Sequence, residues 1–69
     1  MLIGKDVSIK DTDVKGRVVD ETKNTLVIDT DKGLKRIIKD KNRFVVYANE
    51  KEIKIRGEEI NLRPWEYAI

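Results

Sequence analysis

The stretch from Gly16 to Thr30 constrains the fold more than any other part of this chain of 69 residues. Two runs rich in valine, isoleucine and threonine, residue types that favour strands, flank the polar segment Thr22-Lys23-Asn24. Short β-branched runs separated by a few polar residues are typical of a β-hairpin. We therefore expect two antiparallel strands that are joined by a loop of these three polar residues.

The register of this hairpin follows if Glu21 pairs with Thr25. A three-residue loop then needs one left-handed residue, and Asn24 is of a type that tolerates this conformation. Val18 lies opposite Ile28 in this register, and Leu26 joins them on a face that can hold the core.

The same register places Val19 opposite Val27 on the outer face, with Glu21 and Arg17 beside them. A valine pair between charges indicates a surface that a partner covers. Scattered surface valines are the alternative, because folded proteins expose many apolar side chains.

Four further runs complete a pattern of six short strands, at residues 5–10, 34–39, 43–47 and 52–57. In residues 34–39 neither phase buries every apolar residue, so we expect a bulge near Gly33 or Ile37 and leave Leu34 unassigned. Six strands with one apolar face each predict an all-β, small antiparallel barrel, because a flat sheet would leave an apolar face and two edges bare. We expect one domain over residues 1–69. The residues that the four runs turn inward are Val7, Ile9, Ile37, Phe44, Val46, Ile53 and Ile55.

The composition argues against several functional classes. The chain has no cysteine and no histidine, which removes thiolate metal sites, disulfides and the commonest catalytic base. No glycine-rich phosphate loop or nucleophile–base pair is present, so we expect no catalysis by the chain alone and no bound cofactor. No apolar run approaches the ~20 residues that span a bilayer, and no signal-peptide pattern opens the chain. We therefore expect a cytoplasmic protein without membrane contact.

Positive charge is concentrated in the middle of the chain. Residues 31–56 carry nine Lys/Arg against four Asp/Glu, a balance of +5, whereas residues 1–30 sum to −1 and residues 57–69 to −2. Cations that gather on one side of a barrel would bind RNA or DNA phosphates irrespective of sequence. A solvated face that keeps the domain soluble is the alternative. The candidates are Lys32, Lys35, Arg36, Lys39, Lys41 and Arg43.

The hairpin tip is a second candidate for RNA contact. Thr22, Lys23 and Asn24 offer a hydroxyl, an ammonium and an amide, which suit backbone and base-edge contacts. Ordinary turn chemistry explains the same residues equally well. Arg17, on the same hairpin, is included among the RNA-binding candidates. Tyr47 can stack on a base or cover a barrel rim.

The last residues differ in character from the strands. Pro64 makes Arg63 extended and permits a short helical turn after it. Trp65, with Leu62 and Tyr67, either docks a protein partner or folds back over an open end of the barrel.

Several of these residues together resemble the Sm-like protein family known as ribonuclease P protein component 1, from archaea. The resemblance spans nearly the whole chain, and the run from Asp20 to Ile28 is its most specific part. The residues that carry it are Leu2-Ile3-Gly4, Gly16, Val18 to Ile28, Lys35-Arg36-Ile37, Phe44, Gly57 and Arg63-Pro64.

The resemblance implies a twisted Sm-like barrel that serves as a non-catalytic subunit of a ribonucleoprotein. That complex removes the 5′ leader from precursor transfer RNA at an RNA active site, and the metal ions belong to the RNA. The implied partners are the ribonuclease P RNA, a zinc-ribbon protein subunit and, indirectly, the precursor transfer RNA. By this resemblance Lys23, Asn24 and the cations of residues 34–39 face RNA, whereas Leu2, Ile3, Val19 and Val27 contact the protein partner.

Two alternatives remain open at this point. One is a protein-only adaptor, an SH3-like barrel whose outer apolar strip binds a peptide or a domain. The other is an Sm-type protein that assembles into rings. We expect a monomer when the chain is isolated.

Overall fold

Six strands and three short 3-10 helices follow one another along residues 1–68, the part of the chain that the structure, a computed structural model, describes. Ile69, which the expected domain includes, lies outside the described residues. None of the helices in this part is long and apolar enough to cross a membrane. The elements are β1 (Asp6–Ile9), β2 (Lys15–Glu21), β3 (Thr25–Thr30), β4 (Gly33–Ile38), η1 (Lys39–Lys41), β5 (Arg43–Ala48), β6 (Lys51–Arg56), η2 (Gly57–Ile60) and η3 (Pro64–Glu66).

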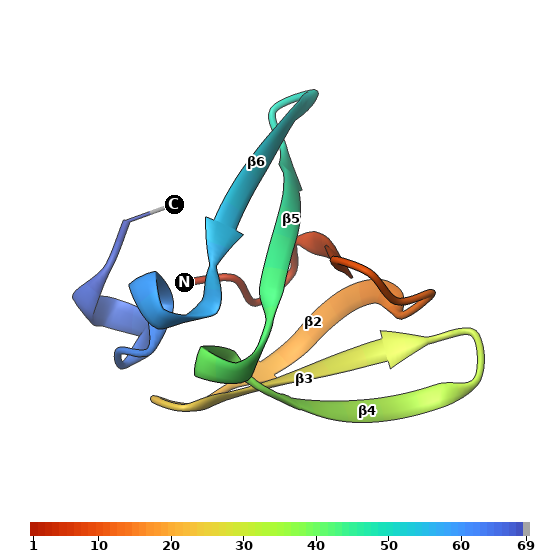
Figure 1. Cartoon of the computed structure of the whole chain (residues 1–69), viewed down its shortest axis with the longest axis horizontal. Helices are drawn as coiled ribbons and strands as arrows, with labels where there is room; N and C mark the ends of the chain where they lie inside the picture. Colours follow the sequence, from red (N-terminus) through yellow and green to blue (C-terminus); the bar gives the residue numbers. More distant parts are fainter. Residues whose placement is uncertain (69) are drawn as a thin grey trace.

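The strands form one antiparallel sheet in the order β4-β3-β2-β1-β5-β6, which confirms the all-β prediction. The β5–β6 hairpin stands steeply across β3 and β4, so the sheet is strongly curved (Figure 1). No ladder joins β4 to β6 within residues 1–68, so the barrel is not closed by strand pairing. Instead η1 and η2 meet between these edges, where the N–H of Gly57 donates to the carbonyl oxygen of Asn42 at 2.8 Å.

The core lies on the concave side of this curved sheet. Ile37 is half-buried against it, as expected, and the unassigned Leu34 is 68% exposed. Ile53 lies opposite the buried Val46 and so points inward, as expected, but it remains 37% exposed because β6 is an edge strand. The buried apolar residues are Leu2, Val7, Ile9, Val18, Leu26, Ile28, Phe44, Val46, Ile55 and Ile60.

The central hairpin has the predicted strands but a different register. Val18 lies opposite Ile28, as expected, whereas Glu21 pairs with Leu26 and not with Thr25. The register shifts after Val18 because Val19 is an extra residue, a β-bulge. Because Glu21 pairs with Leu26, the connection has four residues and not three. Asn24 is not among the residues with positive φ, so its expected left-handed conformation is wrong.

The β3–β4 pairing is continuous from Thr25–Ile38 to Thr30–Gly33, so the bulge predicted in β4 is also wrong. Gly33 takes positive φ at the turn between β3 and β4. Apolar and polar residues alternate imperfectly along residues 34–39 because Lys39, the residue that follows β4, is charged and yet points inward.

Two glycines are required because other backbone segments pass very close to them. A Cβ at Gly16 would lie 2.1 Å from the carbonyl oxygen of Asp29, and a Cβ at Gly57 would lie 1.4 Å from that of Lys39. Gly16 therefore permits the close approach of β2 to β3, and Gly57 permits the contact of η2 with η1.

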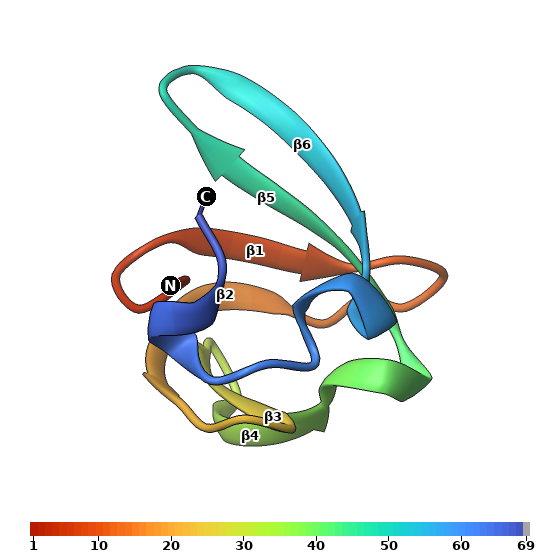
Figure 2. The same ribbon diagram turned by 90° about the vertical axis from the view of Figure 1, so that its left-hand side faces the viewer.

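The two ends of the described chain lie close together. Figures 1 and 2 place the N-terminus beside the C-terminal segment that follows η2. Backbone hydrogen bonds fix the first residues, since the N–H of Gly4 donates to the carbonyl oxygen of Val18 at 2.8 Å. Leu2 is buried beneath them.

Candidate functional site

The polar groups at the tip of the β2–β3 hairpin are mostly used within the protein. The hydroxyls of Thr22 and Thr25 lie 2.6 Å apart, and the N–H of Thr25 donates to the hydroxyl of Thr22. The amide Nδ2 of Asn24 donates to Oδ1 of Asn61 at 2.8 Å. Lys23 is exposed and has no ion-pair partner among residues 1–68. Of the three tip candidates, Lys23 therefore has the polar group that is most available to a ligand.

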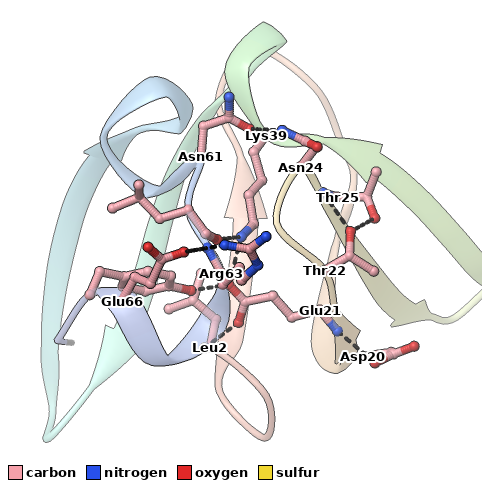
Figure 3. A network of polar contacts seen from close by, with 12 residues as sticks. Leu2, Asp20, Glu21, Thr22, Asn24, Thr25, Lys39, Asn61, Arg63 and Glu66 are labelled. Atoms are coloured by element: carbon pink, nitrogen blue, oxygen red, sulfur yellow. Dashed lines mark hydrogen bonds and ion pairs between the residues drawn. The ribbon is translucent and has the colours of Figure 1, made fainter.

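An ion pair lies in the interior below this tip (Figure 3). The Nζ of Lys39 is 2.8 Å from Oε2 of Glu21, and both side chains are 0% exposed. The expectation that Lys39 is a surface cation that binds RNA is therefore wrong. The expectation that Glu21 lies on the outer face is wrong as well.

Backbone geometry explains why these two charged residues face inward. In β2 the extra residue Val19 reverses the alternation, so Val18 and Glu21 are both buried while Val19 and Asp20 are exposed. In β4 the half-buried Ile37 faces the core, and Lys39, two residues later, lies on the same side. The irregular alternation around residues 34–39 was the one signal in the sequence for this arrangement.

Every remaining polar group around the ion pair has a partner. The Nζ of Lys39 also donates to the carbonyl oxygen of Leu62 at 2.9 Å, and lies 5.4 Å from the ring centroid of Tyr67. Oε1 of Glu21 accepts the N–H of Leu2 at 2.8 Å, and Oε2 accepts the hydroxyl of Tyr67. No buried side-chain nitrogen or oxygen within residues 1–68 lacks a hydrogen-bond partner.

Burial and the neighbouring carboxylate act on Tyr67 in the same direction. Loss of hydration is the larger cause that raises the pKa of the phenol, and its hydrogen bond to Glu21 and the negative charge of Glu21 add to the effect. Tyr67 therefore stays protonated and acts as a hydrogen-bond donor over the ordinary pH range. The cluster of Glu21, Lys39 and Tyr67 ties the N-terminal residues and the C-terminal segment to the sheet, and we call it the buried clamp.

The buried clamp has no feature of a catalytic or metal site. Its charges are neutralised inside the protein, and its donors and acceptors are already paired with each other. The described residues contain no group of three or more Asp, Glu, His or Cys that could hold a metal ion. Its donors and acceptors hold the N-terminal residues and the C-terminal segment against the sheet.

The cations of β4 and its preceding turn lie on the open edge of the sheet. Lys32 and Lys35 are exposed and line a hollow of ≈ 590 Å³ together with Lys15. This hollow is not basic itself, because four aspartates line it as well: Asp6, Asp13, Asp29 and Asp31. Arg36 pairs with Val27 and is exposed on the outer face. These cations have no carboxylate oxygen within 4.0 Å among residues 1–68.

The other predicted cations are located elsewhere. Lys41 and Arg43 line a hollow of ≈ 220 Å³ between η1 and β6, and neither lines the hollow of Lys32 and Lys35. The basic segment of residues 32–43 is thus divided between two surfaces and the interior, and the expected single cluster is wrong. The chain turns through η1 in the middle of the segment, which redirects the cations that follow.

Three exposed cations near Arg43 were missed by sequence reasoning. Lys10, Lys54 and Arg56 line a further hollow of ≈ 470 Å³ together with Arg43. Lys54 and Arg56 occupy the polar positions of an alternating strand, a pattern that does not indicate which other cations lie beside them. The adjacency of β1, β5 and β6 was the missing information.

Arg17 and Tyr47 lie on the outer face of the sheet. Nε of Arg17 is 3.6 Å from Oδ1 of Asp6, and both side chains are well exposed, so the pair is weak. The hydroxyl of Tyr47 is 3.4 Å from that of Ser8, and its ring is partly open to solvent. Both residues remain available to a ligand.

The expected protein-contact residues divide into one core residue and several surface residues. Leu2 is fully buried, so its assignment to a protein interface is wrong. Trp65 is 77% exposed and does not cover the barrel end, whereas Tyr67 packs against the core. Val27 is half-buried. The exposed members of the set are Ile3, Val19, Leu62 and Trp65.

The fold and these surfaces together define a small all-β, barrel-like domain with exposed cations at β4 and a basic hollow on β5 and β6. A buried ion pair fixes its scaffold. Residues 3–68 match the family model for ribonuclease P/MRP, subunit p29. The chain belongs to this family, and the predicted resemblance is confirmed.

A curated relative agrees with this assignment. The chain is 51% identical over 51 residues to "Ribonuclease P protein component 1" of Archaeoglobus fulgidus. The alignment covers 74% of this chain and 50% of the relative, so the chain spans about half the length of the curated relative it matches.

Proposed function

We propose that this ribonuclease P subunit is an RNA-binding, non-catalytic protein of the archaeal complex. In this proposal it acts in the cytoplasm and supports removal of the 5′ leader from precursor transfer RNA by the catalytic RNA. The metal ions of the reaction belong to that RNA and not to this chain.

The observation that carries the proposal is the set of unpaired cations at β4. Lys32, Lys35 and Arg36 are exposed and have no carboxylate oxygen within 4.0 Å among residues 1–68. Phosphates bound by such side chains release condensed counterions, which gives affinity without sequence preference. Lys23 at the hairpin tip and Arg17 on β2 add to the same binding function.

The proposed partners are the ribonuclease P RNA, a zinc-ribbon protein subunit and, indirectly, precursor transfer RNA. Trp65 is the strongest candidate for protein contact, because a tryptophan 77% exposed next to exposed Leu62 favours a covered surface. Ile3, Val19 and the half-buried Val27 are secondary candidates.

A salt series of filter-binding measurements tests the RNA-binding role. The double variant Lys35→Ala with Arg36→Ala should bind ribonuclease P RNA and unrelated structured RNAs more weakly. Loss of two phosphate contacts should lower the slope of log affinity against log salt by about 1.4–1.8. Lys5→Ala with Lys51→Ala removes the same two charges elsewhere and controls for a general loss of charge.

Two results would contradict the proposal. Binding of the wild-type chain that does not change with salt would favour a protein-only adaptor. Cleavage of precursor transfer RNA by the isolated chain would contradict the non-catalytic role.

A further inference from the structure

A second basic surface lies on the β5–β6 hairpin, at the end nearest η1 and η2. Its hollow of ≈ 470 Å³ has an apolar floor that includes Phe44, Val45 and Ile55. We call this surface the β5–β6 hollow. The cations that line it are Lys10, Arg43, Lys54 and Arg56.

Strand pairing brings these cations together from three segments of the chain. Arg43 lies directly opposite Arg56 in the β5–β6 ladder, and Lys54 lies opposite Val45. The N–H of Lys10, just after β1, donates to the carbonyl oxygen of Arg43 at 2.9 Å. The sheet therefore fixes the backbone positions of all four cations.

The negative charge nearby compensates only one of the four. Glu59 is the one carboxylate in the lining, and its Oε1 is 3.3 Å from Nε of Arg56. Glu58 lies 3.5 Å from another nitrogen of Arg56. Within residues 1–68, Lys10, Arg43 and Lys54 have no carboxylate oxygen within 4.0 Å.

The uncompensated cations favour an anionic ligand. Arg43 lies directly opposite Arg56, and Glu58 and Glu59 offset the charge of Arg56 but not that of Arg43. A guanidinium binds phosphate oxygens with good geometry, so Arg43 is suited to contact a phosphate.

The floor of the hollow identifies which part of a nucleic acid fits. Phe44 and Ile55 are buried, so neither offers an open face on which a base can stack. The hollow of ≈ 220 Å³ beside it shares Arg43 and Arg56 and adds Lys41, together with the carboxylates of Asp40 and Glu58, so a row of cations continues there with part of its charge offset. An extended track of cations without a stacking platform matches a chain of phosphates.

We propose that the β5–β6 hollow binds the phosphodiester backbone of RNA, as a contact surface separate from the β4 edge. The inference rests on the proposed RNA-binding function and names a site for it. Lys10, Arg43 and Lys54 contact phosphate directly, and Lys41 continues the track.

The test uses one double variant, Lys10→Gln with Lys54→Gln. Filter binding across a salt series compares its affinity for ribonuclease P RNA with that of the wild-type chain. The slope of log affinity against log salt should fall by about 1.4–1.8, with weaker binding at every salt concentration. Lys5→Gln with Lys51→Gln removes the same charge elsewhere and should change the slope far less. Melting temperatures of both variants should match the wild type, since Lys10 and Lys54 are exposed and unpaired.

A second measurement needs no RNA. Titration of the wild-type chain with inorganic tripolyphosphate should shift the amide resonances of Arg43 and Lys54, and the double variant should lose these shifts.

The outcomes separate this inference from the function on which it rests. One outcome is that the Lys10→Gln, Lys54→Gln variant shows the same slope as the Lys5→Gln, Lys51→Gln control while Lys35→Ala with Arg36→Ala still lowers the slope. That result would contradict phosphate binding in the β5–β6 hollow and leave the proposed RNA-binding function intact. Absence of salt-dependent RNA binding by the wild-type chain would overturn both.

Discussion

Glu21 and Lys39 hold the two ends of this chain together through a fully buried ion pair. Removing two charges from water is costly, and the attraction between them offsets this cost only when the remaining donors and acceptors are paired. Leu2, Leu62 and Tyr67 provide those partners. The pair therefore acts less as a source of stability than as a device that specifies which residues meet.

Lys39→Met should be strongly destabilising, because it leaves the carboxylate of Glu21 buried without a cation. We expect the free energy of unfolding to fall by about 3–5 kcal/mol in urea titrations. Glu21→Gln combined with Lys39→Met should lose clearly less, because the uncompensated charge is gone and an acceptor for Leu2 remains. If the double variant is as unstable as the sum of the two single variants, the charges are not coupled.

Tyr67 should make stability depend on alkaline pH. Burial and Glu21 raise the pKa of the phenol in the folded protein above its value of about 10 in the unfolded chain. The folded state then holds the proton more tightly, so this contribution is present below about pH 10 and is lost as the pH rises above it. Unfolding free energies measured between pH 8 and 11 should fall more steeply for the wild type than for Tyr67→Phe. Parallel curves would show that Tyr67 ionises equally easily in both states.

At the scale of elements, the sequence predicts a strand and its buried face best where the alternation of apolar and polar residues allows only one inward face. β1 and β5 follow their alternation directly, and their inward residues Val7, Ile9, Phe44 and Val46 are all buried. The turn of Pro64 is equally local, since proline fixes its own backbone and restricts Arg63. These features depend on neighbours in sequence alone.

The bulge in β2 shows where this reasoning fails. A single extra residue, Val19, moves Glu21 from the outer face to the core, and nothing within β2 itself indicates it. The reason lies 18 residues away, in the buried Nζ of Lys39 that Glu21 meets. The irregular alternation of residues 34–39 is a signal that one of them faces inward unexpectedly, but a local pattern does not identify its partner. The prediction of surface residues was affected most, because Lys39, a predicted RNA contact, is part of the core.

At the scale of the whole molecule, charge is sorted by surface and not by sequence segment. The +5 of residues 31–56 divides between the β4 edge, the β5–β6 hollow and the interior, while the acidic residues of η2 lie beside Arg56. A formal net charge of only +2 therefore conceals two separate basic surfaces. Only the pairing of β1 with β5, which in turn pairs with β6, brings Lys10 to the second surface.

The two open edges of the sheet bear on whether the chain assembles with itself. β4 and β6 each have one neighbour, so their outer backbone groups could pair with a second copy. Exposed Lys35 and Arg36 on β4, and Glu52 and Lys54 on β6, oppose such pairing, because charged edge residues keep strands of other copies apart.

Sedimentation equilibrium should therefore give a monomer of 8.0 kDa. Lys35→Val with Arg36→Val removes the charges of the β4 edge and adds two strand-favouring residues, so this variant should associate at concentrations where the wild type does not. Lys5→Gln with Lys51→Gln, which lowers the net charge equally, should stay monomeric, because it leaves the β4 edge unchanged. A wild-type chain that sediments as a closed ring would instead mean that the β4 edge is an assembly surface. In that case its cations could not serve as a free RNA-binding surface.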